Sequence, residues 1–107
     1  MMYGLEENII SYIQHVFASY PEVDEVILYG SRAKGNYKPG SDIDLTLKGN
    51  NINFSILSKI SWQLDDLLLP YTFDLSIFRQ IDNTGLIEHI NKAGFVFYKK
   101  SSSVVSD

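Results

Sequence analysis

Residues 25–47 read EVILYGSRAKGNYKPGSDIDLTL, and this stretch decides the fold. Residues 25–29 are rich in β-branched and aromatic side chains and stop at a glycine, which predicts a short strand. The glycine-rich segment 30–41 predicts a loop with one helical turn near residues 31–34. Over residues 43–48 apolar side chains alternate with polar ones, which predicts a second strand with one apolar and one polar face.

Two amphipathic helices are predicted on either side of this stretch. Apolar residues recur at helical spacing from about residue 5 to residue 19, and Pro21 closes that segment. The same spacing recurs over residues 56–68, and Pro70 ends it.

The C-terminal third predicts two more strands with a short helix between them. Alternating residues predict a third strand over 73–77, and residues 95–98 predict a last strand at the sheet edge. Asp82 or Asn83 caps the intervening helix, which ends at Gly94. We therefore expect an α+β fold: a mixed sheet of about four strands, with helices packed mainly on one face.

Length and composition limit the chain to one domain. A chain of 107 residues with 45% hydrophobic and 21% charged residues is typical of an ordered globular protein. We assign residues 1–100 to a single domain and residues 101–107 to a flexible polar tail.

The charge balance and the cysteine count exclude several kinds of site. Nine basic against thirteen acidic residues give a net charge of −4, which disfavours non-specific binding to nucleic acid or to anionic membranes. No cysteine is present, so a disulfide, a thiolate metal site and a cysteine nucleophile are excluded. No apolar run is long enough for a membrane span, and Glu6 and Glu7 stand where a signal peptide would be basic. We expect a cytoplasmic protein.

Three carboxylates are predicted to meet on the polar face of the sheet. Asp42 and Asp44 are two residues apart, so their side chains leave the same face of the second strand. Asp74 lies on the polar face of the third strand. If these strands are neighbours, the three acids converge, and such a cluster needs protons or divalent cations to neutralise it. Oxygen ligands without cysteine favour Mg²⁺.

A candidate phosphate-binding turn follows the first strand. Gly30 allows a close approach of the backbone to a ligand, and Ser31 adds a hydroxyl group. Arg32 and Lys34 lie in the same turn, with Lys38 a few residues later. A phosphate cradle beside an acidic metal site is what metal-dependent nucleotidyl transfer requires.

These residues resemble a known family. Gly30-Ser31, ten intervening residues and Asp42-Ile43-Asp44 are similar to the signature of the DNA polymerase β-type nucleotidyltransferase superfamily, with Asp74 in the place of its third acid. The form GSRAKG…SDIDL is most similar to the minimal nucleotidyltransferases, which are commonly encoded beside HEPN-domain toxins as antitoxins.

The resemblance implies a role for each of these residues. Asp42 and Asp44 would bind the metal ions, two Mg²⁺, that carry a nucleoside triphosphate, which we expect to be ATP. Asp74 would complete the metal site and help to activate the attacking hydroxyl. Gly30 and Ser31 would hold the outer phosphates. Arg32 would assist them through its charge.

The remaining conspicuous residues are interpreted as structural. Tyr37 covers the loop rather than stacking on a base. His15 and His89 lie on predicted helices without a second ligand at metal spacing. Trp62 is expected either in the core or on a face that contacts a partner.

Three functions remain open at this point. The leading one is transfer of AMP from ATP to a hydroxyl of a HEPN-domain toxin, which makes the protein an antitoxin. The second is a non-catalytic binding module that neutralises its partner by contact alone. The third is a small-molecule nucleotidyltransferase of the antibiotic-modifying kind, although a chain this short offers no second domain for the acceptor unless it forms a homo-oligomer.

Overall fold

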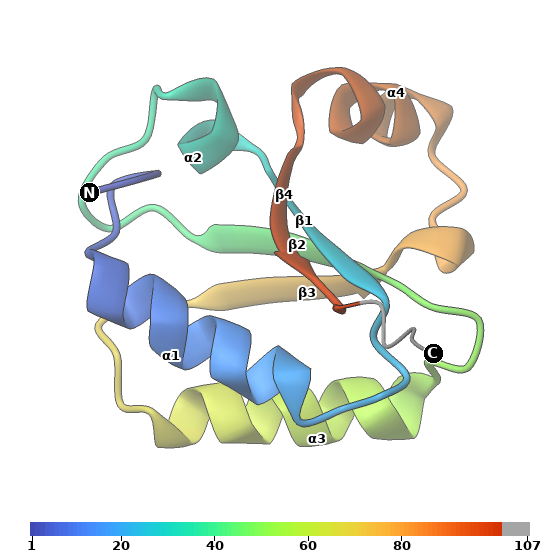
Figure 1. Cartoon of the computed structure of the whole chain (residues 1–107). Coiled ribbons are helices and arrows are strands. Elements are labelled where there is room, and N and C mark those ends of the chain that lie inside the picture. The colour runs from blue at the N-terminus through green and yellow to red at the C-terminus, as the bar shows by residue number, and fades with distance from the viewer. Residues whose placement is uncertain (102–107) are drawn as a thin grey trace.

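The computed structural model describes residues 1–101. Nearly all of the tail expected over 101–107 therefore lies outside the described residues. The helices and strands are, in chain order, α1 (Glu7–Ala18), β1 (Glu25–Tyr29), α2 (Ser31–Lys34), β2 (Ile43–Lys48), α3 (Phe54–Asp66), β3 (Phe73–Ile77), the 3₁₀ turn η1 (Phe78–Gln80), α4 (Thr84–Ala93) and β4 (Phe95–Lys99) (Figure 1).

The four strands form one mixed sheet in the order β3-β2-β1-β4. β2 and β3 pair in parallel, whereas β1 pairs antiparallel with both β2 and β4. β3 and β4 are thus the edge strands. The predicted mixed four-stranded sheet is confirmed, and so is the edge position of the last strand.

The helices cover the two faces of the sheet unequally. Figure 1 shows α1 and α3 side by side on one face, with α2 and α4 on the other side of the sheet. The larger apolar core lies under α1 and α3 and includes Phe17, Leu28, Leu45 and Ile60. A smaller cluster under α4 joins its buried Ile90 to strand β1. The expectation that helices pack mainly on one face is confirmed, and α4 covers only part of the other.

Asparagine caps set where α3 and α4 begin. The Asn53 side chain accepts a hydrogen bond from the Ile56 N–H at 2.9 Å, so α3 starts two residues before the predicted position. Asn83 accepts from the Leu86 N–H at 3.0 Å and is therefore the cap of α4, not Asp82. Each cap satisfies an N–H group that has no partner inside its own helix.

The structure also bears on two further expectations, the place of Trp62 and the lack of a membrane span. Trp62 on α3 is 76% exposed, so it is not a core residue. Among residues 1–101, none of the helices has both the length and the apolar character that a membrane crossing demands.

Candidate active site

The centre of the site is a pair of aspartates on adjacent strands. Asp44 of β2 and Asp74 of β3 are direct partners in the parallel register. Ile43 and Leu45 belong to the core beneath α1 and α3, so the side chain of Asp44 leaves the opposite face. The two carboxylates therefore stand side by side on the polar face, as the alternation in the sequence predicts.

The raised pKa of the Asp44 carboxyl reflects its partial burial and the negative charges gathered around it. Partial burial raises the pKa of the Asp44 carboxyl, and the negative charges of Asp74 and Asp42 raise it further. The positive charge of Arg32 acts in the opposite direction. Asp42 is exposed in the segment just before β2. All three predicted acids thus act on the same small region.

Gly30 forms a tight turn against Asp44. Its φ angle of 78° lies in the left-handed region that favours glycine. A Cβ at this position would collide with the Asp44 carboxylate. The absence of a side chain is therefore what lets the backbone turn pass directly beside the acid. Half-buried Ser31 follows as the first residue of α2, where the sequence predicts one helical turn.

Arg32 has a different place from the one expected of a phosphate ligand. Its side chain is only 2% exposed and donates hydrogen bonds to the carbonyl oxygens of Tyr3 at 2.9 Å and Ser41 at 2.9 and 3.2 Å. The guanidinium also lies over the rings of Tyr37 and Tyr71, 5.3 and 5.0 Å from their centroids. This geometry favours a role in holding the loop together, with an electrostatic effect on Asp44.

The two lysines near the turn and Tyr37 are on the surface. Lys34 and Lys38 are exposed. Tyr37 lies over the Arg32 guanidinium, in agreement with the interpretation that it covers the loop.

Sequence reasoning missed His89. The N–H of Gly30 donates a hydrogen bond to His89 Nε2 at 3.0 Å, although the two residues are 59 positions apart. The interpretation of His89 as structural holds only in the sense that it supports the turn of the site. No local pattern could have found this contact, because it depends on where α4 packs.

Tyr29 was also missed, although the sequence held a signal for it. It is the direct partner of Asp44 across the β1–β2 pair and is buried in the α4 cluster. Burial raises the pKa of the Tyr29 phenol, and the charges of Asp74 and Asp44 add to the rise. Tyr29 is the last residue of the predicted strand, directly before Gly30, so the sequence indicates that its side chain lies on one of the two faces of the sheet at the site. Only the pairing of β1 with β2 shows that this is the acidic face.

The donor set fits a hard divalent cation. Asp44 and Asp74 offer neighbouring carboxylate oxygens, and their mutual repulsion is relieved by a cation between them. Over residues 1–101, however, no three histidine or acidic side chains form a ready-made metal cage. The protein therefore supplies two adjacent carboxylates with Asp42 nearby, and further oxygen ligands have to come from a bound phosphate or from water.

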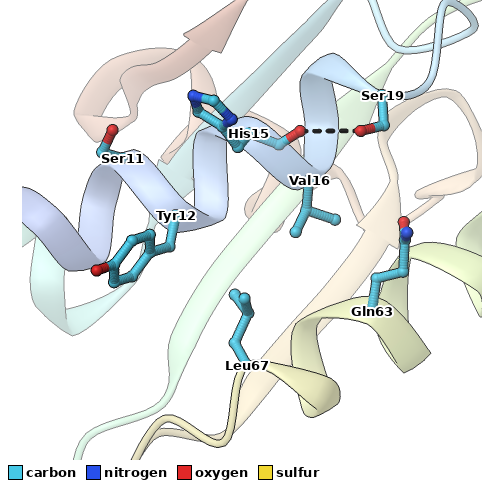
Figure 2. A pocket seen from close by; sticks show the side chains of 7 residues that line it. All are labelled: Ser11, Tyr12, His15, Val16, Ser19, Gln63 and Leu67. Carbon is cyan, nitrogen blue, oxygen red and sulfur yellow. Dashed lines mark hydrogen bonds between the residues drawn. The ribbon is translucent and has the colours of Figure 1, made fainter.

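A groove on the opposite side of the molecule carries none of this chemistry. It measures about 410 Å³ and lies between α1 and the end of α3 (Figure 2). Tyr12, Val16 and Leu67 give it an apolar lining, and the Ser19 hydroxyl donates to the His15 carbonyl at 3.2 Å at its rim. No acidic residue lines this groove, so the exposed His15 has no acidic partner for a metal site there.

The sequence matches one protein family over most of its length. Residues 11–103 match the family described as "Polymerase beta, Nucleotidyltransferase". No curated protein sequence is significantly similar to the chain.

Several solved structures share the fold. A toxin–antitoxin with AMP-PNP has a TM-score of 0.67 at 22% identity, over 90% of this chain and 75% of that one. A tri-AMPylated Shewanella oneidensis HEPN toxin in complex with an MNT antitoxin gives 0.66 at 16% identity, over 90% and 74%. A putative nucleotidyltransferase from Sulfolobus solfataricus gives 0.51 at 21% identity, over 90% and 81%.

Proposed function

Because the chain belongs to the polymerase beta nucleotidyltransferase family, we propose that it transfers AMP from ATP to a hydroxyl group of a HEPN-domain toxin and thereby acts as an antitoxin. The observation that carries the reaction is the Asp44–Asp74 pair beside the Gly30 turn. Two similar structures support the nucleotide and the partner: one is of a toxin–antitoxin with AMP-PNP, and the other contains an AMPylated HEPN toxin.

In the reaction, the acceptor oxygen forms a bond to the α-phosphorus of ATP. The bond from that phosphorus to the bridging oxygen breaks, and pyrophosphate leaves. Asp42, Asp44 and Asp74 would hold Mg²⁺, which supplies neutralisation of the triphosphate charge when it is bound. Asp74 is exposed on an edge strand. We assign it the role of the base that accepts the proton of the acceptor hydroxyl. The Gly30–Ser31 turn holds the outer phosphates, with Gly30 shaping the turn and Ser31 offering its N–H and hydroxyl groups.

Asp74 lies on the edge strand β3 and is exposed, so an acceptor can approach it at the edge of the sheet. Asp74 borders a groove of about 370 Å³ between α3 and β3, together with Phe54, Ser58 and Phe73. Phe54 is 76% exposed and also borders a second groove, which Trp62 lines. Phe54 and Trp62 lie on the α3 side of the sheet, whereas the Asp74 carboxylate lies on the opposite face, so a partner that contacts these residues would have to extend around the β3 edge to present a hydroxyl to Asp74.

The direct test is transfer of label from α-labelled ATP, in the presence of Mg²⁺, to the protein encoded by the neighbouring gene, which we expect to be a HEPN-domain toxin. We expect one labelled acceptor and no transfer when EDTA removes the metal. Mg²⁺ and ATP at ten times the Kd should also stabilise the fold by about 1.4 kcal/mol, which is measured as a rise in Tm. The Asp44→Asn variant should show little of this rise.

The double variant Asp42→Asn/Asp44→Asn separates chemistry from contact. We expect it to lose transfer and protection against the toxin while it still forms the complex. Full protection by the double variant would instead show that the chain neutralises its partner by binding alone. Absence of transfer by the wild type with any of the four nucleotides would contradict the enzymatic function.

A further inference from the structure

One hydrogen bond joins the phosphate-binding turn to a helix far away in the sequence. His89 Nε2 accepts the Gly30 N–H at 3.0 Å in a partly buried contact. An imidazole nitrogen accepts only when it carries no proton, so this bond requires the ring form with Nε2 unprotonated. The imidazole packs edge-on against the Tyr29 ring, with the centroids 6.1 Å apart and the planes at 75°.

The helix that carries His89 is itself held on the sheet. Ile90, the next residue of α4, is 2% exposed and packs with Ile27 and Tyr29 of β1. Figure 1 shows α4 over the face of the sheet opposite α1 and α3. The His89 ring therefore projects from a packed helix. Its position relative to the end of β1 is set by the packing of Ile90 on β1 and by the contact of the ring with Tyr29.

Gly30 needs such a support because its neighbourhood is crowded. Its positive φ angle is held beside the Asp44 carboxylate, at a distance that leaves no room for a Cβ. The Gly30 carbonyl accepts a hydrogen bond from the Lys34 N–H at 3.0 Å, which holds one side of the turn. The hydrogen bond to His89 also fixes the direction of the Gly30 N–H bond.

We propose that His89 is a positioning residue of the nucleotide site: by accepting the Gly30 N–H, it holds the Gly30–Ser31 turn in the orientation that receives the triphosphate. The inference rests on the proposed function, since it assigns the turn to nucleotide binding. The Gly30 N–H is engaged by His89, so the turn is left to contact phosphate through the groups of Ser31. His89 itself touches neither nucleotide nor acceptor.

Three substitutions of His89 separate the hydrogen bond from the packing of the ring. In His89→Gln, the side-chain oxygen can replace Nε2 as the acceptor. In His89→Phe, an aromatic ring still packs on Tyr29 but offers no acceptor, and His89→Leu gives a second variant without one. His15→Phe on the exposed side of α1 is the matched control.

The measurements are the exchange rate of the Gly30 amide proton by NMR, the Kd for AMP-PNP with Mg²⁺, and Tm. We expect faster Gly30 exchange and roughly fivefold to tenfold weaker AMP-PNP binding in His89→Phe and His89→Leu. His89→Gln should stay within about twofold of the wild type, and His15→Phe should match it.

The outcomes distinguish this inference from the proposed function. The role of His89 is overturned if Gly30 exchange is unchanged in both His89→Phe and His89→Leu. It is also overturned if exchange becomes faster but the affinity for AMP-PNP stays the same. In either case the proposed function stands as long as the wild type binds AMP-PNP and transfers AMP. A weaker affinity in His89→Gln equal to that of His89→Phe also overturns the role of His89, because packing would then be the cause. A wild type that does not bind AMP-PNP overturns both.

Discussion

Asp44 and Asp74 occupy directly opposed positions on two parallel strands, so that two acidic side chains share one face of the sheet without an intervening residue. Burial of Asp44 and the charge of its partner both disfavour the ionised carboxylate. The protein thus keeps an unfavourable arrangement at neutral pH, and the cost is relieved when a cation binds. The first two predictions follow from this pair.

Asp44→Asn should stabilise the metal-free protein at pH 7. The pKa of Asp44 is raised in the folded state, so the folded state holds the proton more tightly than the unfolded state. The contribution of Asp44 to stability is therefore largest at low pH and falls as pH rises through the ordinary carboxyl pKa of about 3.9 and then through the raised one. Denaturant unfolding across pH should show the variant gaining on the wild type as pH rises. Asp24→Asn is the exposed control, and an equal gain in it would contradict the assignment.

Asp74→Asn should reduce transfer more than it reduces nucleotide binding. Loss of a group that accepts the acceptor proton costs about 100-fold or more in rate. The effect is measured as the rate of labelling of the HEPN-domain partner at saturating ATP, with the Kd for AMP-PNP measured in parallel. Asp24→Asn again serves as the control. A variant with a wild-type labelling rate would remove Asp74 from the chemistry.

Gly30→Ala should lower the free energy of unfolding by about 2–3 kcal/mol, because a positive φ strains the alanine and its Cβ meets the Asp44 carboxylate. Gly35 shares the positive φ but has open space around it, so Gly35→Ala should cost only about 1 kcal/mol. Gly40→Ala has neither problem and should be close to neutral. Chemical denaturation of the three variants tests this order, and equal costs for Gly30 and Gly35 would show that the close contact with Asp44 is unimportant.

Arg32→Met should destabilise the fold by about 2–4 kcal/mol, because it removes three hydrogen bonds to the carbonyls of Tyr3 and Ser41 inside a buried site. Lys34→Met, two residues away and exposed, should change stability little. Thermal and denaturant unfolding measure the difference. A stable Arg32→Met variant with sharply weakened ATP binding would instead support a direct role of Arg32 on phosphate.

Much of the site could be predicted because its parts are local. The alternation of residues 43–48 predicts that Asp42 and Asp44 lie on the polar side of one strand. The Gly30-Ser31 pair predicts a turn at the end of another strand. The number of strands and the mixed sheet also followed from the spacing of apolar residues, and they are confirmed. Each of these conclusions depends only on neighbours in the chain.

The partners of these local features were decided by the tertiary structure. Asp44 lies opposite Asp74 and Tyr29 because β3 and β1 flank β2 in a particular register. That arrangement of strands is determined by the burial of apolar residues, far apart in the sequence, under α1 and α3. The same packing places His89 within reach of Gly30. Short-range periodicity determines the face on which a side chain lies. The burial of segments far apart in the chain determines what stands beside it.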